Sequence, residues 1–533
     1  MTGYGVAFGL AWRRSRFFYL WWLLGLACLM PLAVWQYDEF IRSESHPELM
    51  LELMAQNPTM RALLGPAFDL ASPGGFTFWR VGLFVAIGAA MMAGLGVVRG
   101  TRADEEAGRC ELIRAGSLSR HAPLAASLVL ACIASAGLAA VVDSSMVATG
   151  QPLAGSAAAG AGIGLTGVVY AGVAAVFAQV FESARTVRTW TLGVALGGSY
   201  LVRARIDGMG EAGSLQALRW AVPLEWAALV RPYAAERWWV LLLPIGLGLV
   251  LAALAFWLEA RRDHGAGLVP ARQGPATAAA WLRGSLGLVW RVQRVSILGW
   301  LIGLGVAALG LGSLAGAMER IVAQNARFSA MVQALGGNAS QFRDAYLVAM
   351  MGLMAVAVAI FAAQVLARAR EEETQGRVEF LLSTAMPRVR FVAGHAGAAL
   401  LVSGVALCEA GVLLALPEAL ATGRAAGIWE AVGAVAVLYT GVVFVVGLAV
   451  LLIGWLPRWT LVLWLVLCWS VVAVWLLPLF GLPGWLVDLH PWGYLPQLPV
   501  EELGWAPVVT ELAVAASLAA VGAVGYRRRD IPR

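Results

Sequence analysis

The chain has 533 residues, of which 60% are hydrophobic and only 13% are charged. A soluble domain usually carries about a quarter charged residues, so this composition excludes an ordinary soluble protein. All 38 basic residues are arginine, and a chain without lysine cannot build the usual P-loop, whose lysine reaches the β- and γ-phosphates of ATP. If the protein uses ATP, a partner must therefore bind the nucleotide.

Long apolar runs recur along the whole chain, and many approach or exceed the roughly 20 residues that an α-helix needs to cross a bilayer. The runs are continuous, whereas a transmembrane β-barrel would show alternating segments of about ten residues. The sequence therefore predicts an all-α polytopic membrane protein with about twelve transmembrane helices. In chain order the predicted spans are 17–35, 76–98, 121–142, 156–181, 189–205, 238–258, 296–316, 345–366, 391–416, 428–454, 459–480 and 506–525.

The placement of arginine predicts the orientation of these spans, because cytoplasmic loops of membrane proteins carry an excess of basic residues. If the N-terminus lies inside, the inner segments hold 26 of the 38 arginines but only 12 of the 32 acidic residues. We therefore expect a multi-pass protein of the cell membrane, a bacterial plasma membrane, with both termini in the cytoplasm. The basic N-terminal stretch is interpreted as the start of a retained first helix, because no convincing cleavage site follows it.

Matched motifs divide the chain into two halves. The pattern R-x-[DE]-E-x-x-G-R-x-E, followed by two apolar residues, occurs at Arg102–Ile113 and again about 268 residues later at Arg370–Leu381. Such ordered matches indicate a tandem duplication. Six spans in each half return the chain to the same side, which predicts parallel repeats with pseudo-twofold symmetry. The expected organisation is a first half at 1–265, a cytoplasmic linker at 266–289 and a second half at 290–533. Further matches pair Trp12 with Trp290, Trp22 with Trp300, Trp190 with Trp459, and Arg261 with Arg528.

Each copy of the charged pattern follows the second span of its half. In a helix, Glu105 and Arg109 would form a stabilising pair four residues apart, as would Glu373 and Arg377. Acidic residues on a cytoplasmic surface element suggest a protein partner with basic groups. The alternative interpretation is a solvated loop that merely follows the charge bias of the membrane.

The second copy resembles a segment of ABC-2 type exporter permeases. That family carries a cytoplasmic segment after its second span that reads roughly E-x-E-x-G-T-x-E-x-L-L-x-[ST]-P, and Glu371–Pro387 is similar to it. Asp104–Ser119 is a more divergent twin. The chain departs from the pattern by having Arg109 and Arg377 where threonine is common, and by fusing two units. The fused form resembles the double-length permeases of multidrug or polyketide-antibiotic exporters.

This resemblance implies a transport subunit that is not itself an enzyme. It implies two copies of a separate ABC ATPase that bind ATP and magnesium, no cofactor in this chain, and an amphipathic or hydrophobic drug-like or antibiotic-like cargo. The charged segments would then be the coupling helices that dock on the ATPase. The residues implied in coupling are Asp104, Glu105, Gly108, Arg109 and Glu111 in the first copy and Glu372, Glu373, Gly376, Arg377 and Glu379 in the second.

A proton-driven secondary drug transporter of the major-facilitator type is the alternative. Its G-x-x-x-D-x-x-G-R pattern resembles the stretch from Gly100 to Arg109, which has one residue too many, and the second copy lacks the leading glycine. Members of that family rarely have large outer segments at both places where this chain has them, in both halves.

The possible substrate path rests on three residues inside predicted spans. Glu409 lies in the ninth span, where an acidic residue is a functional candidate that could bind a cationic substrate. Trp464 and Trp469 in the eleventh span could line an apolar path. Hydration or pairing of the acid, and packing of the indoles against lipid or helices, are the alternatives. The five histidines show no metal-ligand spacing, and nothing in the sequence suggests a catalytic site or nucleic-acid binding.

Overall fold

The structure, a computed structural model, folds as two compact units, Met1–Gly274 and Pro275–Arg533. The boundary between them falls inside the predicted linker. Within the described residues the regular structure is helical, and the extended pairing is one isolated parallel bridge between Phe181 and Val269. The described residues are 3–43, 51, 55, 58–109, 119–210, 215–263, 265–270, 277, 279, 282, 284–324, 339–374, 376–383, 386–423, 425–475, 488–498 and 501–529.

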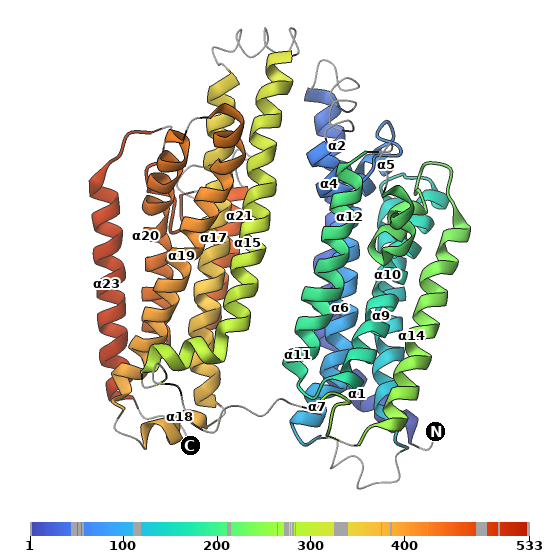
Figure 1. Cartoon of the computed structure of the whole chain (residues 1–533), viewed down its shortest axis with the longest axis horizontal. Coiled ribbons are helices and arrows are strands. Elements are labelled where there is room, and N and C mark those ends of the chain that lie inside the picture. Colours follow the sequence, from blue (N-terminus) through green and yellow to red (C-terminus); the bar gives the residue numbers. More distant parts are fainter. Residues whose placement is uncertain are drawn as a thin grey trace. The chain divides into compact units, whose positions relative to one another are not determined.

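Long helices that pack through small residues form the core of the first unit (Figure 1). A side chain at Gly160 or Gly164 of α10 would collide with the backbone of α9, so glycine permits this close approach. The elements of this unit are α1 Tyr4–Ala27, α2 Leu29–Ser43, α4 Pro58–Leu64, α5 Pro73–Thr77, η1 Phe78–Gly82, α6 Leu83–Gly100, α7 Arg102–Glu106, α9 Ala122–Ala148, α10 Leu153–Val180, α11 Ala184–Arg188, η2 Thr189–Gly197, α12 Gly198–Gly208, η3 Gln216–Ala221, η4 Pro223–Glu225, α13 Trp226–Leu229, η5 Trp238–Leu241 and α14 Leu242–Arg261.

The second unit uses the same packing principle between different helices. Gly447 and Gly454 of α20 lie against the backbone of α23, and a Cβ at either position would meet a carbonyl oxygen of that helix. The elements of this unit are α15 Ser285–Gln324, α17 Ala339–Thr374, α18 Arg377–Leu382, α19 Arg388–Thr422, α20 Ala426–Trp455, α21 Leu461–Trp475 and α23 Trp505–Arg528.

Ten helices of the described residues are long and apolar enough to cross a membrane. They coincide with ten predicted spans, so the prediction of an all-α polytopic membrane protein is confirmed. The predicted span 189–205 lies in a continuous helical stretch built from α11, η2 and α12, and the span 459–480 corresponds to α21, which is described as far as Trp475. The count of twelve and the pseudo-twofold symmetry stay predictions.

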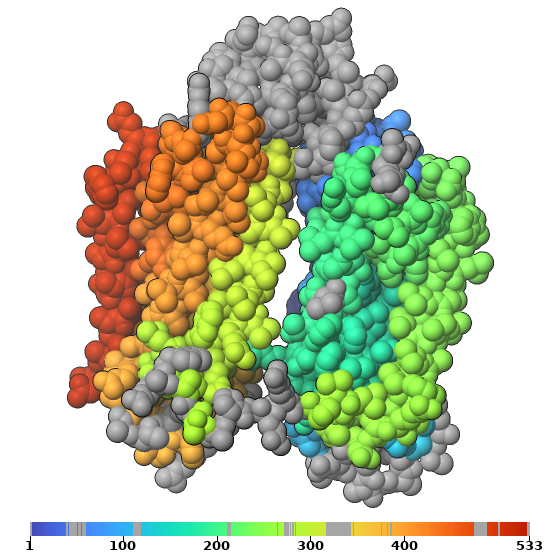
Figure 2. Space-filling model, viewed as in Figure 1, coloured from blue at the N-terminus to red at the C-terminus, as the bar shows by residue number. Residues whose placement is uncertain are grey.

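Helix α14 carries large apolar side chains on its outer surface. Leu242, Leu249 and Val250 are each more than 60% exposed, and Figure 2 shows this light-green helix along the outside of the first unit. Apolar side chains in such a position would be costly in water but are suited to the hydrocarbon of a bilayer.

The segment between α12 and α14 of the first unit contains a buried network of four charged side chains. The Nε of Arg203 lies 3.2 Å from Asp207 and 2.9 Å from Glu225. Arg219 lies 3.0 Å from each of the same two carboxylates. Arg203 and Asp207, at the end of α12, are therefore not solvent-exposed charges but partners of Arg219 and Glu225 in the short helices that follow.

Candidate functional site

The first charged segment, Arg102–Arg109, begins where helix α6 ends. Thr101 interrupts the helix with φ −119° and ψ −95°, so α7 leaves in a new direction. After α7, Gly108 adopts φ +67°, a left-handed conformation that glycine tolerates best, and its N–H donates to the carbonyl of Glu105 at 3.0 Å. This turn brings Arg109 back toward α7.

Asp104 is held between two arginines. Both amino groups of Arg14, on helix α1, donate to the two carboxylate oxygens at 2.5 and 2.7 Å. Arg109 donates to the same carboxylate from Nη2 at 2.7 Å and from Nε at 3.2 Å. Bidentate arginine–carboxylate contacts are strong and directional, so this arrangement ties α1 to α7.

Glu105, whose side chain is 9% exposed, ties the segment to two other parts of the unit. Arg262, just after α14, donates to its two oxygens at 2.5 and 3.1 Å. Arg102 donates to Glu105 at 2.7 Å, and also to the carbonyls of Ala178 at 2.8 Å and Ala266 at 2.6 Å. The end of α10 and the chain after α14 are therefore fixed to α7.

The second charged segment, Arg370–Arg377, repeats this arrangement in the second unit. Glu373 accepts from Arg370 at 2.6 Å and from Arg529, at the end of α23, at 2.7 Å. Glu372 accepts from Arg377 at 2.6 and 3.0 Å. Hydrogen bonding to Glu372 raises the pKa of the Arg377 guanidinium above its ordinary value.

Three ion pairs and one turn thus recur in both units. The pairs Arg102–Glu105, Asp104–Arg109 and Arg262–Glu105 correspond to Arg370–Glu373, Glu372–Arg377 and Arg529–Glu373. Gly376 has φ +72° and donates to the carbonyl of Glu373 at 3.0 Å, as Gly108 does to Glu105. We call each set of three pairs an ion-pair cluster. The two matched sequence segments therefore also match in their local geometry.

The expected pairing at four-residue spacing is wrong. Glu105 does not pair with Arg109, and Glu373 does not pair with Arg377, because the left-handed glycine turn redirects each arginine to the acid five residues before it. Sequence reasoning also missed Arg14, Arg262 and Arg529 as partners. Arg262 and Arg529 directly follow the matched pair of Arg261 and Arg528, and that match was the available signal.

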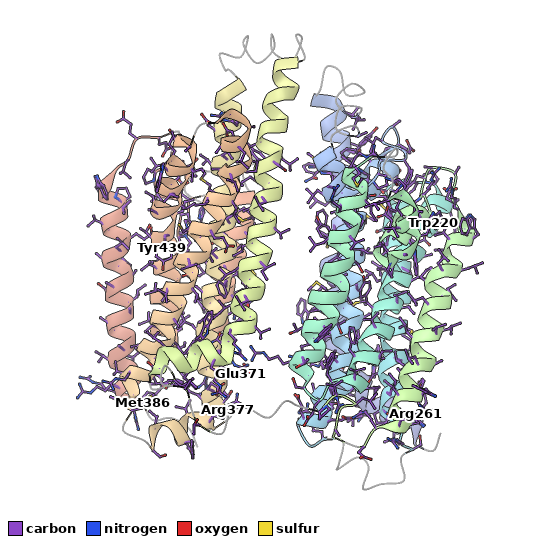
Figure 3. The ribbon with its side chains drawn as sticks, viewed as in Figure 1. Trp220, Arg261, Glu371, Arg377, Met386 and Tyr439 are labelled. Atoms are coloured by element: carbon purple, nitrogen blue, oxygen red, sulfur yellow. The ribbon has the colours of Figure 1, made fainter. Side chains whose placement is uncertain are left out.

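Only part of each segment is offered to a partner. Arg109, Glu371 and Arg377 have side chains that are 47%, 46% and 50% exposed. Glu379 is exposed, and Phe380 is 80% exposed. Figure 3 shows Glu371 and Arg377 at the same end of the second unit. We call the four residues of the second unit, Glu371, Arg377, Glu379 and Phe380, the docking face.

The remaining predicted coupling residues have other positions. Glu105 and Glu373 are buried in the ion-pair clusters, with side chains that are 9% and 1% exposed. Asp104 and Glu372 lie beneath their arginines. Glu111 lies outside the described residues.

The three residues of the predicted substrate path lie on two helices. The carboxylate of Glu409 on α19 packs beside Gly305 of α15, where a Cβ would be 3.1 Å from its Oε1. Trp464 of α21 packs against the core of the second unit. Trp469 donates to the carbonyl of Leu489 at 2.6 Å. A shared path for these residues stays a prediction.

Comparison with known proteins gives two findings. The family model described as the C-terminal domain of the multidrug efflux system permease Rv1217c matches residues 282–527. The multidrug efflux system permease protein Rv1217c of Mycobacterium tuberculosis is 37% identical over 476 residues, which are 89% of this chain and 85% of that relative.

Proposed function

Because the chain belongs to the family of multidrug efflux system permeases represented by Rv1217c, we propose that it is the membrane permease of an ABC exporter. In this proposal the permease moves an amphipathic or hydrophobic drug-like compound out of the cell. A separate ATPase, present in two copies, binds ATP with magnesium and supplies the energy. The permease itself contributes transport and no catalytic site.

The repeated ion-pair cluster is the observation that carries the ATPase part of the proposal. Each charged segment is a short rigid element, fixed at one end of its unit to the last long helix through Arg262 or Arg529. A protein that binds the exposed side of the segment and changes shape would therefore displace whole helices and not a free loop. Two equivalent elements suit two copies of one partner.

The chemistry of the docking face suits a protein surface better than a lipid surface. An interfacial helix that binds lipid carries basic residues on its polar face, whereas this face has one arginine, Arg377, beside the acids Glu371 and Glu379. Phe380 adds a large apolar group, and exposed aromatic residues with a polar surround are typical anchors of protein interfaces.

Co-purification tests the partner directly. The chain is expressed with the ATPase encoded beside its gene, if one is present, and stimulated ATP hydrolysis is measured in nanodiscs. We expect a stable complex whose hydrolysis falls about tenfold or more in Phe380→Ala, since an anchor residue contributes about 2 kcal/mol to an interface. Trp429→Ala is the matched control, because Trp429 is 73% exposed at the start of α20 and lies outside the docking face. A purified chain that neither binds the ATPase nor stimulates it contradicts the proposal.

A proton-driven transporter is distinguished in inverted vesicles. With ATP held constant, collapse of the proton gradient should leave drug transport in place, and Glu409→Gln should not abolish it. Transport that stops when the gradient is collapsed would favour the secondary-transporter mechanism instead.

A further inference from the structure

The second unit contains a cavity of about 490 Å³ next to its charged segment. Helices α15, α17, α18 and α19 line it. Its apolar wall includes Val289 and Val292 of α15 and Phe391 of α19, and its polar rim includes Glu372 and Arg368 of α17. We call it the α18 pocket. Its volume is in the range of pockets that take drug-sized ligands, and its lining is the expected one: mostly apolar with a few convergent polar groups.

The first unit has a cavity at the equivalent place, but it is nearly filled. This cavity measures about 40 Å³, and its lining includes Ala11, Arg14 and Asp104. The repeat aligns these residues with Val289, Val292 and Glu372. In the first unit the side chain of Arg14 crosses the space and places its guanidinium on Asp104 at 2.5 and 2.7 Å. In the second unit valine stands in place of that arginine, and the space stays open.

The two places also differ in the charge of the side chains around them. In the first unit Arg14 and Arg109 face one carboxylate, Asp104. In the second unit Arg368 and Arg377 face two carboxylates, because Glu371 stands where the first unit has Ala103. Both sites thus have two arginines, and the second has one carboxylate more, so the net charge of these side chains is one unit lower at the second site. The second site also has open volume where the first has the side chain of Arg14.

We propose that the α18 pocket binds an amphipathic organic cation. The cationic group lies near Glu372, as the Arg14 guanidinium lies on Asp104 in the first unit. The apolar body of the ligand packs against Val289, Val292 and Phe391, and its removal from water favours binding. At the equivalent place in the first unit, the guanidinium of Arg14 already occupies the position of the cation, and the cavity has no room for a ligand. Each chain therefore binds one such ligand at these two places.

This site rests on the proposed function only in treating the ligand as cargo, and its binding is measured without ATP and without the ATPase. Failure to bind the cation would therefore leave the coupling proposal standing, and failure to bind the ATPase would leave this site standing.

Tetraphenylphosphonium is the probe, and tetraphenylborate is its match in shape with the opposite charge. Binding to the purified full chain in a nonionic detergent is measured by equilibrium dialysis. We expect saturable binding of one phosphonium per chain and binding of the borate that is weaker by about tenfold or more, which corresponds to about 1.4 kcal/mol of discrimination by the sign of the charge. Equal affinity for the two probes overturns the proposal.

Two variants locate the site. Val292→Arg introduces the residue that closes the first site and should lower phosphonium affinity by about tenfold or more, whereas the control Val292→Leu should bind like the unchanged chain. Unchanged affinity in Val292→Arg shows that the cation binds elsewhere and overturns the proposal. If Val292→Arg does not fold, Glu372→Gln decides: loss of the preference for phosphonium over borate supports the site, and a preserved preference contradicts it.

Discussion

The two charged segments form corresponding ion-pair clusters, but the helix beside each cluster contributes a different residue to it. In the first unit α1 contributes Arg14 to the cluster, and the cavity between the helices is almost closed. In the second unit α15 contributes Val292, and the cavity is open. After a duplication, parts that both copies need are retained, and parts that only one copy needs are free to diverge. The comparison thus indicates that the clusters hold together the fold of each unit, whereas the open cavity is a property of the second unit alone.

A second contrast concerns the network of Arg203, Asp207, Arg219 and Glu225. These side chains lie between α12 and the short helices that follow it in the first unit, and three of them are at most 1% exposed. The corresponding α21 of the second unit has no charged residue in its described range, Leu461–Trp475. Ion pairs next to the charged segments therefore occur in both units, whereas the described range of α21 offers no charged side chain for a network of this kind.

The largest expected effect comes from removing the central carboxylate of a cluster, which is Glu105 in the first unit and Glu373 in the second. Glu373→Ala leaves Arg370 and Arg529 without their common partner, and Glu105→Ala does the same to Arg102 and Arg262. Breaking a buried ion pair costs about 3–5 kcal/mol, so each variant should unfold at clearly lower temperature in detergent. Glu379→Ala, an exposed acid in α18, is the control and should stay within about 0.5 kcal/mol of the unchanged chain. Equal stability of Glu373→Ala and Glu379→Ala would contradict the structural role of the cluster.

The sequence was sufficient to predict the helical class and the position of ten spans. Runs of about 20 apolar residues leave few alternatives, because in lipid the backbone must satisfy its own hydrogen bonds. The sequence also located both charged segments, since charge is scarce elsewhere and the motif occurs twice. The ends of the helices were less predictable: α1 begins at Tyr4, well before the apolar run that marked it.

The partners within the site could not be predicted from local spacing. Arg14 and Asp104 are 90 residues apart, and their contact depends on how α1 packs against α7. The acids at 104–106 form a charge run that is typical of a solvated surface, yet Glu105 is buried because Arg262 reaches it from the end of α14. The left-handed turn at Gly108 changes which acid Arg109 contacts, and the spacing of the acids does not reveal it.

An intermediate effect is expected from the residue that distinguishes the two units. Arg14→Val gives the first unit the residue of the second, removes a bidentate contact to Asp104 and enlarges the cavity. Hydrogen bonds between charged groups contribute about 1.5–3 kcal/mol, and the one-third exposure of Arg14 reduces this to about 1–2 kcal/mol. Thermal unfolding measures the loss of stability, and equilibrium dialysis should detect a second tetraphenylphosphonium per chain. A variant that loses stability without gaining a second ligand would show that volume and charge alone do not create the site.

A loss of stability of similar size is expected at the left-handed turns. Gly108→Ala and Gly376→Ala place a Cβ in a backbone conformation that costs about 1–2 kcal/mol for a non-glycine residue. Neither Cβ would meet another atom within 4 Å, so the effect isolates the backbone conformation from packing. Gly427→Ala is the control, because Gly427 lies inside helix α20 with equally open surroundings, and alanine is the better helix former there. Similar losses of thermal stability at Gly108 and Gly376 would support the equivalence of the two turns, and a loss at only one of them would contradict it.

The smallest expected effect on stability is also the sharpest test of the charge difference. Glu371→Ala gives the second unit the residue that the first unit has at position 103, and it removes an exposed partner of Arg368. A surface ion pair of this kind contributes about 0–1 kcal/mol, so thermal unfolding should change little. Arg368 then has Glu372 as its remaining acidic neighbour, at 3.5 Å, and competes more strongly with a bound cation for that carboxylate. Tetraphenylphosphonium should therefore bind several-fold more weakly although no wall of the α18 pocket has changed. Unchanged affinity would mean that the open volume at Val292, and not the charge balance, distinguishes the second unit from the first.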